Sequence, residues 1–232
     1  MIKSLIIGLD LSFSSTGITI SYLEDYVGKK IQFHKVVFDK NSNKTTKTYI
    51  PQKIKNVNII TYRLPANLQT IDLVIDMTDD NNVQQCESTV KALMCSKKIG
   101  IIISDSLKQF NPDEVIFSIE NYIMPTFSGS SQLKTVGGLI ALQGYVREIA
   151  IRLCLELKLK FKIYTPTPSS NKLFFAKNGN ADKTLMVKCF FKNYNGNILL
   201  PSTDENSVHL INDLVDSFSL MLNAYSKIII NK

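Results

Sequence analysis

Short apolar runs alternate with polar segments along the chain, in lengths typical of strands and amphipathic helices. Runs of four to eight apolar or alternating residues predict strands, and apolar positions repeating every three or four residues predict helices. Expected strands cover residues 4–10, 16–22, 31–38, 114–120 and 161–165, with one or both of 57–63 and 71–76. Expected helices cover residues 84–109, 133–157 and 208–226, with another starting near Ala181 or Asp182. The segment TPTPSSN, which follows the strand expected at 161–165, is rich in turn residues and predicts a turn. This order of elements predicts an α/β protein.

The first three strands follow one another through short turns, so they are expected to form an antiparallel opening. Residues 40–56 are polar and lysine-rich and contain Pro51, which predicts a loop. The chain contains no internal repeat and no linker between two halves. We therefore predict a single domain over residues 1–232, with an inserted hairpin or subdomain at about 40–80.

Of the 232 residues, 44% are hydrophobic and 20% are charged, as in ordinary globular proteins. No apolar run is long enough to cross a bilayer, and the N-terminus resembles a strand more than a signal peptide. The four cysteines are scattered and there are two histidines, which argues against a zinc site and favours reduced thiols in a cytoplasmic protein. The net charge of +7 indicates an anionic partner such as nucleic acid; codon bias toward lysine is the alternative.

Two predicted strands end at an acidic residue, at Asp10 and at Glu120. The last helix carries Asp213 and Asp216 three residues apart, which places both on one helical face among apolar neighbours. Taken alone, that pair could be surface decoration. If the four carboxylates meet at one edge of the sheet, they repel one another unless divalent cations neutralise them. Such a site suits phosphodiester hydrolysis.

Four sequence blocks in this order resemble those of RuvC-like Holliday-junction resolvases, which belong to the RNase H-like superfamily. The blocks are IIGLDLSFSSTGITI, VIFSIENYIMPTFSGSSQLKTVGGLIALQG, PSSNKLFFAKNGNADKTLMV and NDLVDSFSLML. The resemblance implies an RNase H-like fold with a mixed five-stranded sheet flanked by helices. It also implies a crossover junction endodeoxyribonuclease, in a phage or viral version that would act in the host cytoplasm.

The resemblance also assigns roles to single residues. It implies that two Mg²⁺ ions per active site, with Mn²⁺ as a substitute, are bound by the four carboxylates Asp10, Glu120, Asp213 and Asp216. Lys183 matches a lysine that approaches the scissile phosphate, and Lys172 or Lys177 matches a further DNA contact. Tyr122 stands where the family places residues that meet unstacked bases, although a core tyrosine is an equal alternative.

The implied partners are a second copy of the chain, in a homodimer, and branched DNA: four-way junctions and, more broadly, three-way junctions and flaps. The interval of 110 residues from Asp10 to Glu120 exceeds the compact bacterial pattern, which argues against strict four-way specificity. Two other functions stay open. The segment GLDLSFSSTG also resembles the first phosphate loop of actin-like ATPases and sugar kinases, which predicts a related non-nuclease domain. A catalytically inactive protein that binds branched DNA is the second alternative.

Overall fold

A computed structural model describes residues 3–13, 15–24, 27–39, 53–54, 57–65, 80–122, 130–194 and 205–230. Its strands are β1 (Lys3–Asp10), β2 (Ser15–Glu24), β3 (Val27–Asp39), β4 (Lys53–Ile54), β5 (Val57–Pro65), β6 (Glu114–Ile119) and β7 (Lys160–Tyr164). Its helices are α1 (Asp80–Phe110), α2 (Ser130–Glu156), α3 (Pro168–Ala176), α4 (Lys183–Tyr194) and α5 (Glu205–Ala224), followed by a π-helical turn at Tyr225–Ile230.

The strands form one mixed sheet in the order β4-β5-β3-β2-β1-β6-β7. Strand β2 is antiparallel to both of its neighbours, whereas β1, β6 and β7 are parallel to one another. The prediction of an α/β fold with a mixed sheet and an antiparallel opening is therefore confirmed.

The predicted count of five strands is wrong, because the described residues alone form a sheet of seven strands. Strand β5 pairs in parallel with the outer edge of β3, and the two-residue β4 pairs antiparallel with β5. Both lie within the predicted insertion at 40–80. The apolar pattern predicted a strand at 57–63, which corresponds to β5. It did not predict that β5 pairs with β3, because strand pairing depends on backbone groups of segments that are distant in sequence. The expected strand at 71–76 lies outside the described residues.

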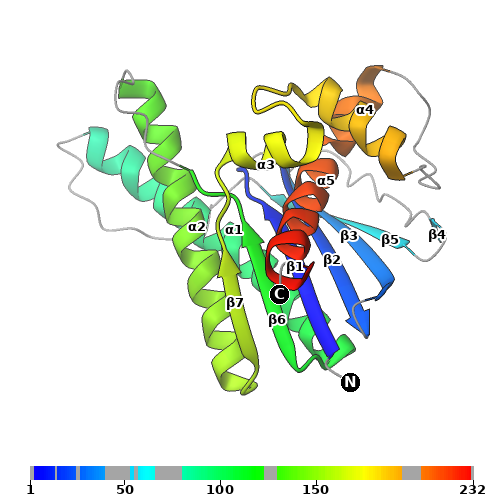
Figure 1. Ribbon diagram of the computed structural model, residues 1–232. Helices are drawn as coiled ribbons and strands as arrows, with labels where there is room; N and C mark the ends of the chain where they lie inside the picture. Colours follow the sequence, from blue (N-terminus) through cyan, green and yellow to red (C-terminus); the bar gives the residue numbers. More distant parts are fainter. Residues whose placement is uncertain are drawn as a thin grey trace.

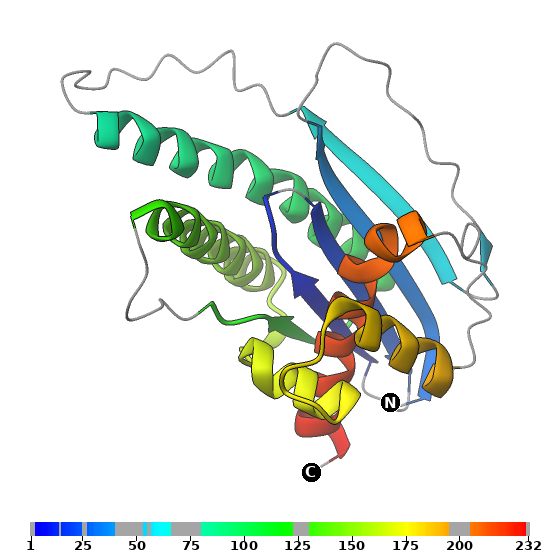
Figure 2. The same ribbon diagram turned by 90° about the horizontal axis from the view of Figure 1, so that it is seen from above.

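Helices cover both faces of the sheet, with α1 and α2 on one face and α3, α4 and α5 on the other (Figures 1 and 2). Successive residues of a strand point to opposite faces, and β1 divides its side chains accordingly. Leu5, Ile7 and Leu9 are buried in the core under α1 and α2. Ile6 is buried in the second core, under α3, α4 and α5. Asp10 lies four residues beyond Ile6 and so points to the α5 face.

Helix α5 lies directly on β1 and β2 because each strand has a glycine beneath it. A Cβ atom on Gly8 would lie 2.7 Å from the backbone nitrogen of Met221, and one on Gly17 would overlap the carbonyl oxygen of Asp213. Atoms at these separations collide. The hydroxyls of Thr19 and Ser217 form a buried hydrogen bond, 2.8 Å long, across the same contact. The glycines therefore bring the backbone of α5 against the sheet.

The predicted helices are confirmed, but a turn expected after β7 is instead the helix α3. The Thr167 side chain accepts a hydrogen bond from the backbone N–H of Ser170 at 3.2 Å, and Pro168 occupies the first helical turn. Threonine caps and N-terminal prolines both favour a helix start. In a segment rich in Pro and Ser, the same residues also fit a turn, which explains the error.

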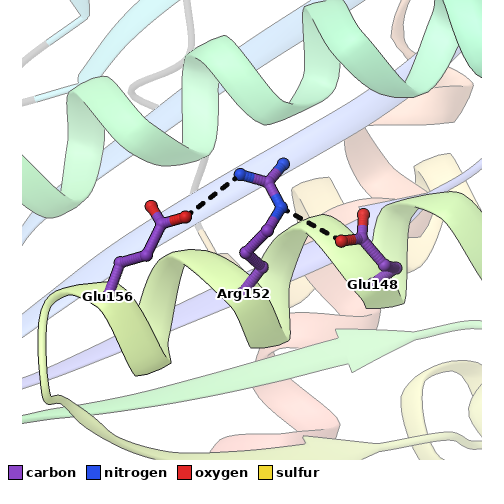
Figure 3. A network of polar contacts seen from close by, with 3 residues as sticks. All are labelled: Glu148, Arg152 and Glu156. Carbon is purple, nitrogen blue, oxygen red and sulfur yellow. Dashed lines mark hydrogen bonds and ion pairs between the residues drawn. The ribbon is translucent and has the colours of Figure 1, made fainter.

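The long helix α2 carries a ladder of charges on its exposed side (Figure 3). Arg152 donates hydrogen bonds to Glu148 at 3.0 Å and to Glu156 at 3.3 Å, and all three side chains are more than half exposed. Water and salt screen exposed pairs of this kind, so they support the helix and contribute little to the stability of the fold.

Among the described residues, no helix is both long and apolar enough to cross a membrane. Among the described cysteines, Cys95, Cys154 and Cys189 are free thiols. The side chains of Cys86, His34 and His209 lie outside the described part of the chain.

Candidate active site

The ends of β1 and β6 place two acids side by side. The strands are parallel neighbours, and Leu9 pairs with Ile119, so Asp10 and Glu120 directly follow a matched pair. Ile116 is buried under α5, and alternation along the strand turns Glu120 toward the same face. Asp10 and Glu120 therefore meet at one edge of the sheet, on the side covered by α5.

Helix α5 adds the other two carboxylates. The backbone of Asp213 rests on Gly17, which pairs with Asp10 across β1 and β2. The hydroxyl of Ser15, also on β2, donates a 2.5 Å hydrogen bond to Oδ2 of Asp213. Asp216 lies one helical turn further along. The structure thus brings together all four carboxylates that the sequence singled out.

Burial and mutual repulsion make the cluster reluctant to ionise fully. Burial raises the pKa of Asp10 well above its ordinary value, and the charges of Asp216, Glu120 and Asp213 raise it further. Burial, followed by the charge of Asp216, raises the pKa of Glu120 to about 7. Burial and the charge of Asp213 raise the pKa of Asp216 to about 6. The pKa of Asp10 thus responds to the charges of the other three carboxylates, which indicates that the four groups lie in one site.

Two lysines counter this negative charge from different helices. Lys183, the first residue of α4, lowers the pKa of Asp10 and of Asp216. Lys172, on α3, lowers the pKa of Glu120 and of Asp216. The helix bearing Lys183 starts where predicted, with the Asp182 side chain accepting a 2.7 Å hydrogen bond from the N–H of Leu185. Both lysines therefore border the carboxylate cluster.

Lys177 is oriented differently. It follows α3 with a left-handed backbone conformation (φ 58°), and its Nζ donates to the carbonyl of Phe174 at 3.1 Å. The same Nζ lies 5.6 Å from the centre of the Phe174 ring. Of the two lysines proposed as the further DNA contact, Lys172 lies at the carboxylates and Lys177 caps its own helix.

Tyr122 ties the two acid-bearing strand ends together. Its hydroxyl donates a 2.6 Å hydrogen bond to the carbonyl of Leu11, one residue beyond Asp10, and its ring packs against the core under α1 and α2. The position of the ring fits the alternative of a core tyrosine, and the hydroxyl also interacts with the side chain of Glu120; a contact between Tyr122 and unstacked bases stays a prediction. On the same side, the buried Gln143 of α2 donates from Nε2 to the carbonyl of Glu120.

The donor set suits a hard divalent cation, because carboxylate oxygens are the ligands that Mg²⁺ and Mn²⁺ prefer. Among the described residues, no group of three or more acidic, histidine or cysteine side chains is arranged closely enough to hold a metal ion. The raised pKa values nevertheless indicate excess negative charge that a bound cation would neutralise. On this chemistry, the residues that would hold such a cation are Asp10, Glu120, Asp213 and Asp216.

The raised pKa values predict a pH dependence of stability. In the unfolded chain these carboxyls lose their protons near pH 4, whereas folded Asp216 and Glu120 keep theirs up to about pH 6 and 7. Between pH 4 and 7 the folded state binds more protons, so the free energy of unfolding falls as the pH rises. We expect the melting temperature in EDTA to fall across this window. Mg²⁺ should restore it more at pH 8 than at pH 5.

The control for that prediction is Glu120→Gln, which removes one of the titrating groups and should flatten the curve recorded in EDTA. Glu114→Gln, at the other end of β6 and away from the carboxylate cluster, is the control for the loss of one glutamate from the same strand. Equal Mg²⁺ stabilisation at both pH values would contradict the presence of a repulsive carboxylate cluster.

Sequence reasoning missed the residues that hold the cluster in place. Ser15, Gly17 and Gln143 were not singled out, although all three contact the backbone or side chain of a predicted site residue. Gly17 carried a usable signal, because a glycine inside a β-branched strand marks a close approach of another backbone. Ser15 and Gln143 carried none, since their partners are 198 and 23 residues away.

No family model and no curated protein matches the sequence. Several solved structures resemble the fold over most of both chains. RuvC of Thermus thermophilus is 12% identical, with a TM-score of 0.42 over 96% of this chain and 95% of that one. The yeast mitochondrial Holliday junction resolvase Ydc2 is 14% identical, with a TM-score of 0.42 over 93% and 75%.

The Mn-soaked, inhibitor-bound nuclease domain of the human cytomegalovirus terminase is 10% identical, with a TM-score of 0.42 over 98% of this chain and 85% of that one. The topology described above has β2 antiparallel to its neighbours and parallel strands β1 and β6, each leading to an acid. With helices on both faces, the described residues have the predicted α/β architecture of a mixed sheet flanked by helices.

Proposed function

We propose that the chain is a metal-dependent, structure-selective endonuclease that resolves Holliday junctions and cuts other branched DNA. The observation that carries this proposal is the meeting of two strand-end acids with two acids of α5, bordered by Lys172 and Lys183. An actin-like ATPase would have no need of Glu120 and the paired acids of α5. The nuclease therefore accounts for more of the site than either alternative.

In the proposed site, the four carboxylates would hold two Mg²⁺ ions, or Mn²⁺ in their place. Divalent cations held there would supply Lewis-acid chemistry for phosphodiester hydrolysis. Ser15 keeps Asp213 oriented, and Tyr122 and Gln143 hold the backbone beside Asp10 and Glu120. Lys183 and Lys172 supply positive charge for the phosphates of the DNA strand, a role that suits lysine.

The proposed substrate is recognised by its shape and its phosphates, with little reading of bases. Paired nicks across a two-fold junction need two active sites related by a two-fold axis, so we propose a homodimer of single-domain subunits. The net charge of +7 supports an electrostatic share in binding.

The proposal is tested by incubating the protein with end-labelled four-way, three-way, flapped and linear duplex DNA, in Mg²⁺, Mn²⁺ or EDTA. We expect nicks near the branch point in either metal and none in EDTA, with linear duplex largely intact. Binding without cleavage in both metals would favour the inactive DNA-binding alternative. ATP hydrolysis without cleavage would favour the ATPase alternative.

Lys183→Ala should lower turnover much more than junction affinity. A charge-assisted contact to the reacting phosphate contributes roughly 1.5 to 3 kcal/mol, equivalent to a 10- to 100-fold loss of kcat. Single-turnover rates and junction affinities, measured separately, check this. Lys188, an exposed lysine of the same helix, provides the matched control as Lys188→Ala. An unchanged rate for Lys183→Ala would make Lys183 a solvated surface lysine.

A further inference from the structure

A chain of buried side-chain hydrogen bonds connects β7, α3 and α5. The hydroxyl of Tyr164 on β7 donates to Oδ1 of Asn223 at 3.4 Å. Nδ2 of Asn223 donates to Oδ1 of Asn171 at 3.3 Å, and Nδ2 of Asn171 donates to the hydroxyl of Ser219 at 2.6 Å. That hydroxyl in turn donates to the backbone carbonyl of Asp216 at 2.8 Å. Every donor in the chain points the same way, toward Asp216.

Asn171 is the central link and occupies a position that an apolar residue would otherwise take. It is one of two buried residues of α3, the other being Phe175 one turn later. Asn171 is 2% exposed, Ser219 is fully buried and Asn223 is 1% exposed. A buried amide costs free energy unless it is hydrogen-bonded, and its bonds have fixed directions. An apolar contact would let α3 slide or turn on α5, whereas these bonds hold it in one position.

The residue after Asn171 is Lys172, so the chain of hydrogen bonds that ends at the carbonyl of Asp216 also fixes the turn of α3 from which the Lys172 side chain starts. The charge of Lys172 acts on both Glu120 and Asp216. We propose that Asn171 is a positioning residue, which through Ser219 and Asn223 holds Lys172 at the carboxylate cluster, where Lys172 binds a phosphate of the DNA strand. This inference rests on the proposed nuclease function.

The test uses the salt dependence of binding to a labelled four-way junction in EDTA, so that no cleavage occurs. Each phosphate contact contributes about 0.9 to the slope of log affinity against log salt concentration. We expect Asn171→Ala and Lys172→Ala each to reduce this slope by about 0.9, and the double variant to reduce it by no more than either. Loss of stability without loss of a phosphate contact would lower the melting temperature and leave the slope unchanged.

Ser219→Ala is the second variant, because it removes one hydroxyl from the same chain of bonds and is less disruptive to folding than Asn171→Ala. It should lower the slope in the same direction. Ser170→Ala is the matched control, since the Ser170 hydroxyl is bonded within α3, to the carbonyl of Thr167 at 2.9 Å. Its slope should equal that of the wild type.

Wild-type slopes for both Asn171→Ala and Ser219→Ala would overturn the inference, as would a double variant that loses about twice the slope of either single variant. In those cases the wild type still binds the junction, and the proposed nuclease function stands. A wild type that does not bind the junction overturns that function and this inference together.

Discussion

Glu120→Gln abolishes DNA cleavage and leaves junction binding intact, if the four carboxylates form the metal site. Glutamine keeps the size of the side chain but cannot supply a negative oxygen to a cation. Metal ions contribute several kcal/mol to transition-state stabilisation, so we expect cleavage in Mg²⁺ to fall by about 1000-fold or more. Single-turnover cleavage and a binding measurement in EDTA separate the two effects.

The fold should survive this substitution. The backbone of Glu120 remains held by Gln143, and loss of one charge relieves the repulsion that raises the pKa of Asp10. We therefore expect the melting temperature in EDTA at pH 8 to stay the same or rise. Glu114→Gln, at the opposite end of β6, is the matched control and should cleave like the wild type. Cleavage by Glu120→Gln at a rate near that of the wild type would refute a role for Glu120 in metal binding.

Gly17→Ala should damage both stability and activity. Its Cβ would overlap the carbonyl oxygen of Asp213, which is backbone in the middle of α5 and cannot rotate away. Overpacking of this kind costs about 1 to 3 kcal/mol, occasionally more. We expect a loss near the upper end of that range. For a chain of this size the melting temperature should fall by roughly 6 to 12 °C.

The substitution also has a specific consequence for the site. Gly17 pairs with Asp10, so a shift of α5 at this point separates Asp213 from Asp10. Cleavage measured well below the melting temperature should therefore fall as well. Gly144→Ala is the matched control, because no atom lies within 4 Å of its added Cβ. In a helix it should stabilise by up to about 1 kcal/mol. Wild-type stability and cleavage in Gly17→Ala would contradict the close approach of α5 to the sheet.

The positions of most elements could be predicted because apolar periodicity is a local property. The strands ending at Asp10 and near Glu120, and the helix bearing Asp213 and Asp216, were all expected where they lie. Helix α3 was not predicted, since its Thr and Pro start signals fit a turn equally well. The predicted number of strands was wrong because β5 joins the sheet by backbone pairing with the outer edge of β3. The apolar pattern of a segment does not indicate which other strand it pairs with.

The site residues also fall into those that the sequence predicted and those that only the structure placed. The candidates Asp10, Glu120, Asp213 and Asp216 followed from residue type and position in the sequence, and Lys183 followed from the resemblance to the resolvases. That Lys172 acts on the carboxylates, that Lys177 contacts Phe174 and that Tyr122 bonds to Leu11 required coordinates. Each depends on the direction in which a side chain leaves its element, and residue type does not specify that direction.

The sequence by itself determined the order of the elements and the acids that end them, because periodicity and residue chemistry act over a few neighbouring positions. Only the tertiary structure decided that these acids meet. The register between β1 and β6 places Asp10 beside Glu120. Two glycines allow α5 to pack closely on β1 and β2, and hydrogen bonds of buried amides hold α3 against α5. These contacts join residues far apart in the chain, and they exist only once the sheet and both helical layers have packed together.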